Sequence, residues 1–139
     1  MTIRIGAERT GRDPSKIGIY ALSMALCGND ETAMEAMKKT VAFYCASPHY
    51  HHILSSAGFG EDAKRIKRLW DQNKHDEALK LVSVDIVKAL TLSGTPREIR
   101  KRIREYISAG VYPIVYPIVR HRTVRADTIY AMKSAAGQF

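Results

Sequence analysis

A cluster of basic side chains near the end of the sequence could bind an anionic ligand. Arg120 and Arg122 flank His121 and follow an apolar run. Guanidinium groups hold phosphates and carboxylates through charge-assisted hydrogen bonds, so these arginines are candidate anion-binding residues. A solvated loop explains the same residues equally well. Asn29 also follows an apolar run, but an asparagine at such a place is more often a helix cap than a ligand contact, by about three to one.

The second candidate group is the histidine-rich segment His49-Tyr50-His51-His52. On a helix, His49 and His52 would share a face, as a pair of metal ligands must. No carboxylate or cysteine nearby completes a ligand set, so ordinary, partly exposed histidines are favoured over a metal site. No residue stands out as a catalytic acid or base, and we assign none.

The composition fits one ordinary globular domain, with 139 residues, 45% hydrophobic residues and 26% charged residues. The net charge of +8 is regional, because most of the excess arginine and lysine lies in residues 96–125. A solvated helix face is favoured over a nucleic-acid site by about two to one, since no interleaved aromatic residues accompany these charges. The cysteines suit a reducing cytoplasm, and no apolar stretch approaches the roughly 20 residues of a membrane span.

Two apolar runs are predicted to form parallel strands. Residues 17–27 are apolar at both odd and even positions, which is typical of a strand buried on both faces. Residues 111–119 are rich in β-branched and aromatic residues, and Pro113 and Pro117 indicate an edge strand, a bulge or an irregular strand end. Helices are predicted for most of the other residues, at about 3–12, 31–46, 47–58, 60–70, 78–81, 84–92, 96–109 and 126–136.

The helix that precedes the second strand has the clearest start signal in the chain. Thr95-Pro96-Arg97-Glu98 is a capping-box pattern with proline at the first helical position. Ile99, Ile103 and Ile107 are expected on its buried face, and Gly110 ends it. Each predicted strand therefore follows a helix across a short glycine-containing loop, as in proteins with alternating strands and helices.

Several stretches, taken together and in this order, resemble the bacterial-luciferase-like family of flavin- or deazaflavin-dependent oxidoreductases. They are AERTGRDPS at residues 7–15, AFYCASPHY at 42–50 with AGFG at 57–60, and SGTPREI at 93–99 with SAGV at 108–111. The branch that includes methylenetetrahydromethanopterin reductases is the most similar. The resemblance implies an α/β fold, the C-terminal part of a luciferase-like (β/α)₈ TIM barrel, mostly helical with two parallel strands. Residues 1–139 would form a single partial domain, with a helical insertion at about residues 30–92.

The resemblance also implies a function. The cofactor would be FMN or a deazaflavin coenzyme, used for hydride transfer or monooxygenation of a small-molecule substrate. Ligands of such barrels lie at the C-terminal ends of the strands, where Asn29, Arg120 and Arg122 would contact the cofactor. His49 and Tyr50, in the insertion near the barrel mouth, would face the substrate.

Two other interpretations of the chain remain open from its sequence. It could be a non-catalytic interaction module that self-associates or pairs with a separate chain supplying the other barrel strands, in which case its strand edges would be exposed. It could also be a basic nucleic-acid-binding protein, but no nucleic-acid-binding motif is present, and this alternative ranks last.

Overall fold

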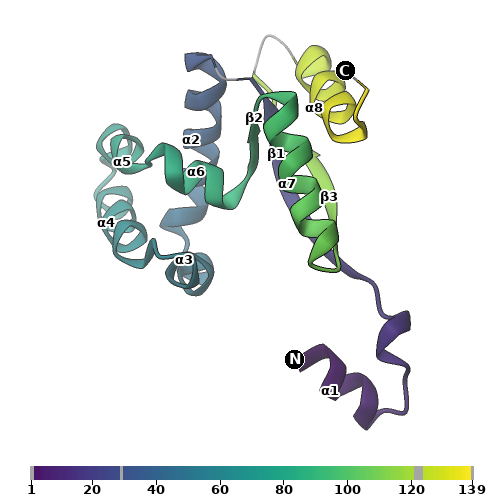
Figure 1. Ribbon diagram of the computed structural model, residues 1–139. Helices are drawn as coiled ribbons and strands as arrows, with labels where there is room; N and C mark the ends of the chain where they lie inside the picture. The colour runs from purple at the N-terminus through teal and green to yellow at the C-terminus, as the bar shows by residue number, and fades with distance from the viewer. Residues whose placement is uncertain (1, 29, 121–123, 139) are drawn as a thin grey trace.

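A small parallel sheet lies at the centre of the computed structural model, which describes residues 2–28, 30–120 and 124–138. Its strands are β1 (Ile19–Cys27), β2 (Leu92–Gly94) and β3 (Val111–Pro117), in the order β2-β1-β3 (Figure 1). All pairing between them is parallel. The sequence predicts β1 and β3 but not β2, and this is a correction to the expected pair of strands. A strand of 3 residues is too short to show an alternating pattern.

Helices make up most of the rest of the described chain, and the predicted helix at residues 31–46 is confirmed. The predicted helix at 84–92 ends earlier, because its last residues enter β2. The α-helices are α1 (Thr2–Arg9), α2 (Glu31–Ala46), α3 (His51–Ser56), α4 (Gly60–Asp71), α5 (His75–Leu81), α6 (Val84–Leu90), α7 (Pro96–Ser108) and α8 (Val124–Ala136), with 3₁₀ turns η1 (Pro14–Lys16) and η2 (Pro48–Tyr50). None of the described helices is long and apolar enough to cross a membrane.

The predicted capping box connects β2 directly to α7. The Thr95 backbone N–H donates to Glu98 Oε2 at 2.8 Å, and the Glu98 N–H donates to Thr95 Oγ1 at 3.3 Å. Gly94 precedes the box with φ +128°, and a Cβ there would lie 2.6 Å from Glu98 Oε2. Only glycine fits this turn. It allows β2 to end at Gly94, directly before Thr95, the cap residue of α7.

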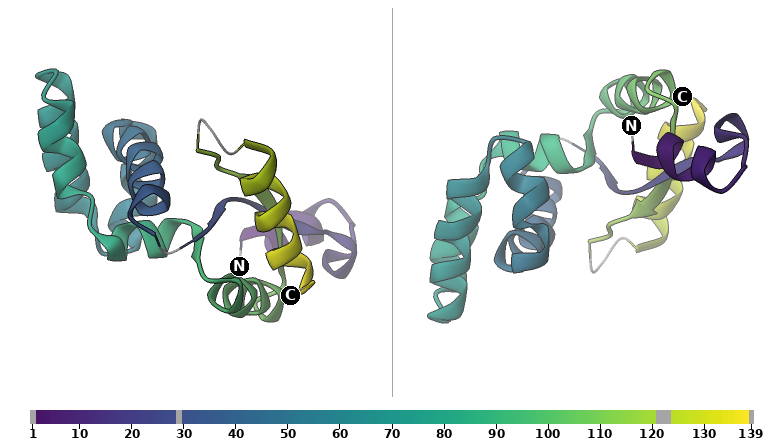
Figure 2. Two further views of the ribbon diagram at one scale, coloured as in Figure 1. Left: turned by 90° about the horizontal axis from the view of Figure 1, so that it is seen from above. Right: turned by 90° about the horizontal axis from the view of Figure 1, so that it is seen from below.

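The helices form two groups with separate cores (Figure 2). The helices α7 and α8 cover one face of the sheet, through a core of Ala25, Cys27, Leu92, Ile99 and Ala131. The helices α2–α6 pack on one another beside the sheet and form the larger core, which includes Leu26 from the end of β1. We call α2–α6 the helical body. The α1 helix lies away from both groups, at the end of an extended segment (Figure 1).

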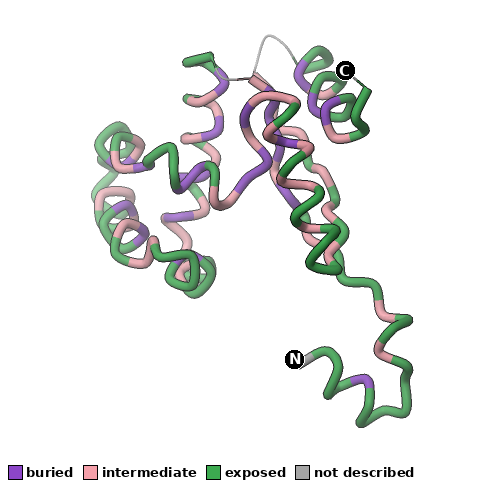
Figure 3. Tube along the Cα trace, viewed as in Figure 1, coloured by how far each residue is buried: buried purple, intermediate pink, exposed green. Residues whose placement is uncertain are grey.

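The prediction that β1 is buried on both faces is correct only for its second half. Ala25 and Leu26 are fully buried, whereas Tyr20 is 65% exposed and Leu22 is 71% exposed (Figure 3). The helices α7 and α8 cover one face of the sheet, and within the described residues nothing covers the other face where the strands begin. Ile107, expected inside, is also half exposed, because it lies in the last turn of α7. Of the alternatives that Pro113 and Pro117 leave open, the described sheet shows β3 as an edge strand.

Candidate functional site

The loops that follow β1 and β3 meet at the C-terminal edge of the sheet. The Gly28 N–H donates to the Gly94 carbonyl at 3.0 Å, and the Ile118 N–H donates to the Ala25 carbonyl at 2.7 Å. These bonds prolong the strand pairing into the loops. They bring Asp30 and Arg120, 90 residues apart in sequence, within contact distance. Ligands of open parallel sheets and of TIM barrels bind at this edge.

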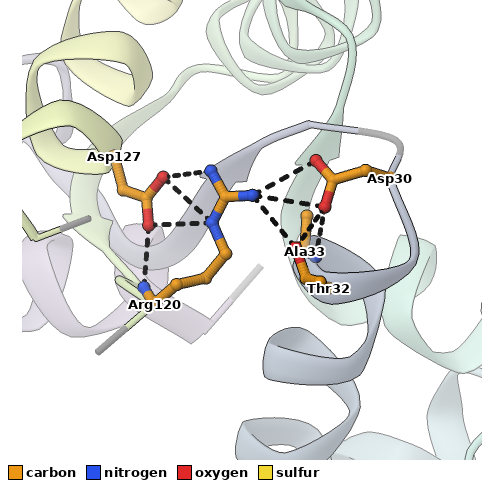
Figure 4. A network of polar contacts seen from close by, with 5 residues as sticks. All are labelled: Asp30, Thr32, Ala33, Arg120 and Asp127. Carbon is orange, nitrogen blue, oxygen red and sulfur yellow. Dashed lines mark hydrogen bonds and ion pairs between the residues drawn. The ribbon is translucent and has the colours of Figure 1, made fainter. Parts of the chain in front are cut away.

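Arg120 holds the two loops together (Figure 4). Its backbone N–H donates to Asp127 Oδ2 at 2.7 Å, and its Nε and Nη2 donate to the same carboxylate at 3.1 and 2.5 Å. Its Nη1 donates to both oxygens of Asp30 at 3.2 Å, and to Thr32 Oγ1 at 3.2 Å. Asp30 in turn caps α2 by accepting from the Ala33 N–H at 2.9 Å. A single guanidinium thus joins the first turn of α2 to the first turns of α8.

The two carboxylates differ in their exposure to solvent. The Asp127 side chain is 2% exposed and the Asp30 side chain is 52% exposed, with Arg120 at 29% between them. Hydrogen bonding to Asp127 raises the pKa of Arg120, and hydrogen bonding to Thr32 lowers the pKa of Asp30. The raised pKa of Arg120 and the lowered pKa of Asp30 keep these two groups charged at neutral pH, so the guanidinium faces the exposed carboxylate as an ion pair. Of the two carboxylates that Arg120 binds, Asp30 is the one that solvent and an incoming anion can reach.

The candidate site residues fall in different places. Arg120 lies in the network just described, and its expected contact with a cofactor stays a prediction. Asn29 and Arg122 lie outside the described residues. His49 and Tyr50 are exposed in η2, beside α2. The neighbouring His51 places its Nε2 2.9 Å from the Cys45 carbonyl, so its ring fastens η2 to the end of α2. Among the described residues no group of three His, Cys, Asp or Glu side chains could hold a metal ion.

Tyr50 lines a cavity between the sheet and the helical body. The cavity has a volume of about 410 Å³, and its lining includes Leu22, Met24 and Tyr116 from the strands and Tyr44, Tyr50 and Leu90 from the helices. The rings of Tyr44 and Tyr50 meet edge to face, with centroids 4.8 Å apart. Among the described residues, no charged side chain lines it. The sequence does not predict this cavity, because its residues come from distant segments. In the sequence, Tyr112, Ile114 and Tyr116 alternate along one face of the second predicted strand, but this pattern does not show that a cavity forms there.

Comparison with known proteins relates this structure to a family. The family described as luciferase-like monooxygenase matches residues 1–112. The 5,10-methylenetetrahydromethanopterin reductase of Methanopyrus kandleri is 31% identical over 116 residues, which cover 81% of this chain and 33% of the reductase. An uncharacterized protein of Mycobacterium tuberculosis is 27% identical over 117 residues, which cover 81% of this chain and 34% of that protein.

A solved structure shows the same relationship in three dimensions. The coenzyme F420 dependent tetrahydromethanopterin reductase from Methanopyrus kandleri matches with a TM-score of 0.66 at 30% identity, over 81% of this chain and 33% of that one. This chain therefore spans about a third of the length of the relatives it matches. The match confirms the predicted α/β fold, with β2 as the correction noted above.

Proposed function

Because this chain belongs to the luciferase-like monooxygenase family, we propose that it forms part of an oxidoreductase that uses a deazaflavin coenzyme. The observation that carries the proposal is the likeness, at about 30% identity in sequence and in structure, to a reductase described as coenzyme F420 dependent. The runner-up is FMN with monooxygenation, the other chemistry that the family resemblance implies. We expect the substrate of the proposed reaction to be a small molecule. We also expect the protein to be located in the cytoplasm.

When bound, a reduced deazaflavin would supply a hydride for an electrophilic carbon of the substrate, and would itself be oxidised by two electrons. The residues of this chain then have to position the reactants and exclude water. The uncharged cavity at Tyr44, Tyr50 and Tyr116 fits a flat ring in its chemistry, because tyrosine rings and aliphatic side chains cover its walls. His49 and Tyr50 remain the proposed contacts to the substrate.

The polar end of the coenzyme would lie at the C-terminal edge of the sheet. Asn29, Arg120 and Arg122 are the proposed contacts there. At Arg120 a phosphate or carboxylate of the ligand would take the place of the exposed Asp30, while the buried Asp127 stays bound. The more exposed carboxylate is the easier one to displace, because fewer of its bonds are shielded from water.

We further propose that residues 1–139 form one part of a larger barrel. Within the described residues β1 is paired with β2 only from Ala25 to Cys27, so its first half has a free edge, and β3 has another. Outside the cavity, the uncovered face carries Tyr20 and Tyr112, each more than half exposed. Additional parallel strands would cover this face and pair with both edges, whether they come from the same polypeptide, a second copy or a separate chain.

The proposal is tested by mixing the protein with reduced coenzyme F420 and methylenetetrahydromethanopterin under anaerobic conditions and following coenzyme oxidation by absorbance. Oxidation that requires both the pterin and the protein supports it. Oxidation of reduced FMN in place of the deazaflavin would move the chain to the flavin-using branch of the family. Heat-denatured protein is the control for the uncatalysed reaction.

A further inference from the structure

A second cavity lies where α6, β2 and α7 meet, three elements that follow one another in the chain (Figure 1). It has a volume of about 200 Å³. Its charged lining residues come from two helices, Lys88 from α6 and Glu98, Lys101, Arg102 and Glu105 from α7. None of these residues is among the contacts proposed above for the coenzyme or the substrate.

The two carboxylates of this cavity are already bound by neighbouring groups. Glu98 Oε2 accepts from the backbone N–H and from the hydroxyl of Thr95, both at 2.8 Å. Glu105 Oε2 accepts from Nη1 of Arg102 at 3.1 Å. The cations of the cavity outnumber the carboxylates, and they are Lys88, Lys101 and Arg102. The lining therefore carries an excess of positive charge, which favours an anionic ligand.

Arg102 holds a buried N–H group that has no acceptor among the described residues. Its Nη1 is bound to Glu105, and its Nη2 lies 3.4 Å from the carbonyl of Ala89 in α6. Its Nε is buried and without a hydrogen-bond partner in the part of the chain that the structure describes. The guanidinium lies over the ring of Tyr106, 5.7 Å from the centroid, which limits its reorientation. Buried donors in folded proteins are almost always paired, so this one indicates a place for an acceptor.

The two lysines of the cavity add further donors. Lys88 Nζ is 3.4 Å from Glu98 Oε1, a long contact that occupies at most one of its three N–H groups. Lys101 has no acceptor within the described residues. A solvated helix face accounts for basic residues on α7 alone. It does not account for a cavity that cations from α6 and α7 share.

The size and the donors of the cavity indicate the class of ligand. A volume of about 200 Å³ is below the roughly 300–1,000 Å³ of sites for larger organic molecules, so the cavity suits a small group. A phosphate group carries nearly two negative charges at neutral pH and several acceptor oxygens, so it can bind a guanidinium and two ammonium groups together. A carboxylate has fewer oxygens and a single charge, and would leave more of these donors unpaired.

We propose that this cavity binds a single phosphate group, either as free inorganic phosphate or as the end of a small phosphomonoester. The ligand would join α6 to α7. These helices belong to different groups, because α6 is part of the helical body and α7 packs on the sheet in a separate core. Binding would therefore fasten the helical body to the sheet. The inference does not depend on the proposed function, since it uses none of the same residues.

The test measures dissociation constants for inorganic phosphate and for glycerol 3-phosphate by isothermal titration calorimetry of the purified protein. Chloride keeps the ionic strength constant, so general screening does not change during the titration. Lys101→Gln and Arg102→Gln each remove one cation of the cavity. Arg104→Gln is the matched control, because Arg104 is exposed on the same helix and does not line the cavity.

Circular dichroism confirms that each variant is folded. Arg102→Gln also breaks the bond to Glu105, whereas Lys101 makes no bond with the described residues. Lys101→Gln therefore keeps the proposal testable if Arg102→Gln is unstable.

We expect phosphate to bind saturably and to raise the Tm, which chloride at equal ionic strength does not. Lys101→Gln should weaken phosphate binding by about fivefold and Arg102→Gln by about tenfold, the loss of one charge-assisted hydrogen bond, with Arg104→Gln within about twofold. Tighter binding of inorganic phosphate assigns the cavity to the free ion, and tighter binding of glycerol 3-phosphate assigns it to a phosphomonoester.

Three results would overturn the proposal. The first is that neither phosphate compound saturates the protein at millimolar concentration. The second is that Arg104→Gln weakens binding as much as Lys101→Gln, which would indicate a general attraction of anions to α7. The third is that phosphate binds but Lys101→Gln leaves its dissociation constant unchanged, which would place the anion elsewhere on the protein. No readout here involves the coenzyme, so the outcome is separate from that of the reductase assay.

Discussion

Replacement of Arg120 by alanine tests the network at the C-terminal edge of the sheet. The substitution leaves the carboxylate of Asp127, 2% exposed, without the guanidinium that donates to it at 2.5 and 3.1 Å. Breaking a buried ion pair costs about 3–5 kcal/mol. The loss here is at or below the lower end of that range, because Arg120 is 29% exposed and its backbone N–H still donates to Asp127. We expect about 2–3 kcal/mol.

Thermal denaturation followed by circular dichroism measures this loss. For a chain of this size 1 kcal/mol corresponds to about 3–5 °C, so Arg120→Ala should lower the Tm by about 10 °C. Asp30→Asn is the matched control. It keeps a residue that can cap α2 but removes the exposed half of the network, and should cost about 0.5 kcal/mol or less. In the double variant Arg120→Ala/Asp127→Asn the losses should be less than additive by at least 1 kcal/mol. A Tm change under about 2 °C for Arg120→Ala would refute the role of the buried pair.

Further predictions concern the cap of α7 and the cysteines. Thr95→Ala should cost about 1 kcal/mol, seen as a lower Tm, whereas Thr95→Ser should keep most of the cap. The backbone and hydroxyl of Thr95 donate to Glu98 and lower its pKa from 4.5 to about 2. The stability from this carboxylate is therefore present above pH 4.5 and lost as the pH falls toward 2, and Glu98→Gln should flatten that part of the pH profile. Burial raises the pKa of the Cys45 thiol to about 11, and Cys27 is 3% exposed. Neither cysteine should react with a thiol reagent at pH 8 until the protein unfolds, and rapid labelling of the native protein would contradict the packing.

Local signals in the sequence account for most of the elements. The capping box at Thr95 predicts a structure that the chain adopts, because a helix cap depends on neighbouring residues alone. One of the basic residues of α7 also has partners close to it in the sequence. Arg102 pairs with Glu105 and lies over the ring of Tyr106. Burial of a strand is different. It depends on what covers the strand, and the apolar pattern of β1 does not reveal that its first half is uncovered.

The candidate site could be predicted only in part, for the same reason. The sequence identifies Arg120 as a candidate anion-binding residue, and the family resemblance places it at the C-terminal end of a strand. Its partners Asp30 and Asp127 come from the starts of two different helices, and only the folded chain shows that they bind the same guanidinium. Tyr50 is predicted to face the substrate, but Tyr44, which packs on it, lies in the predicted helix at residues 31–46, where nothing in the sequence marks it as part of a site.

The measurement that tests the central claim most directly is native mass spectrometry of the protein purified under mild conditions from its own host. The account predicts an assembly larger than one 139-residue chain, either a longer polypeptide or a complex, that releases a deazaflavin coenzyme when denatured. A bare chain of 15.6 kDa that carries no such ligand and takes up neither coenzyme F420 nor FMN would contradict it.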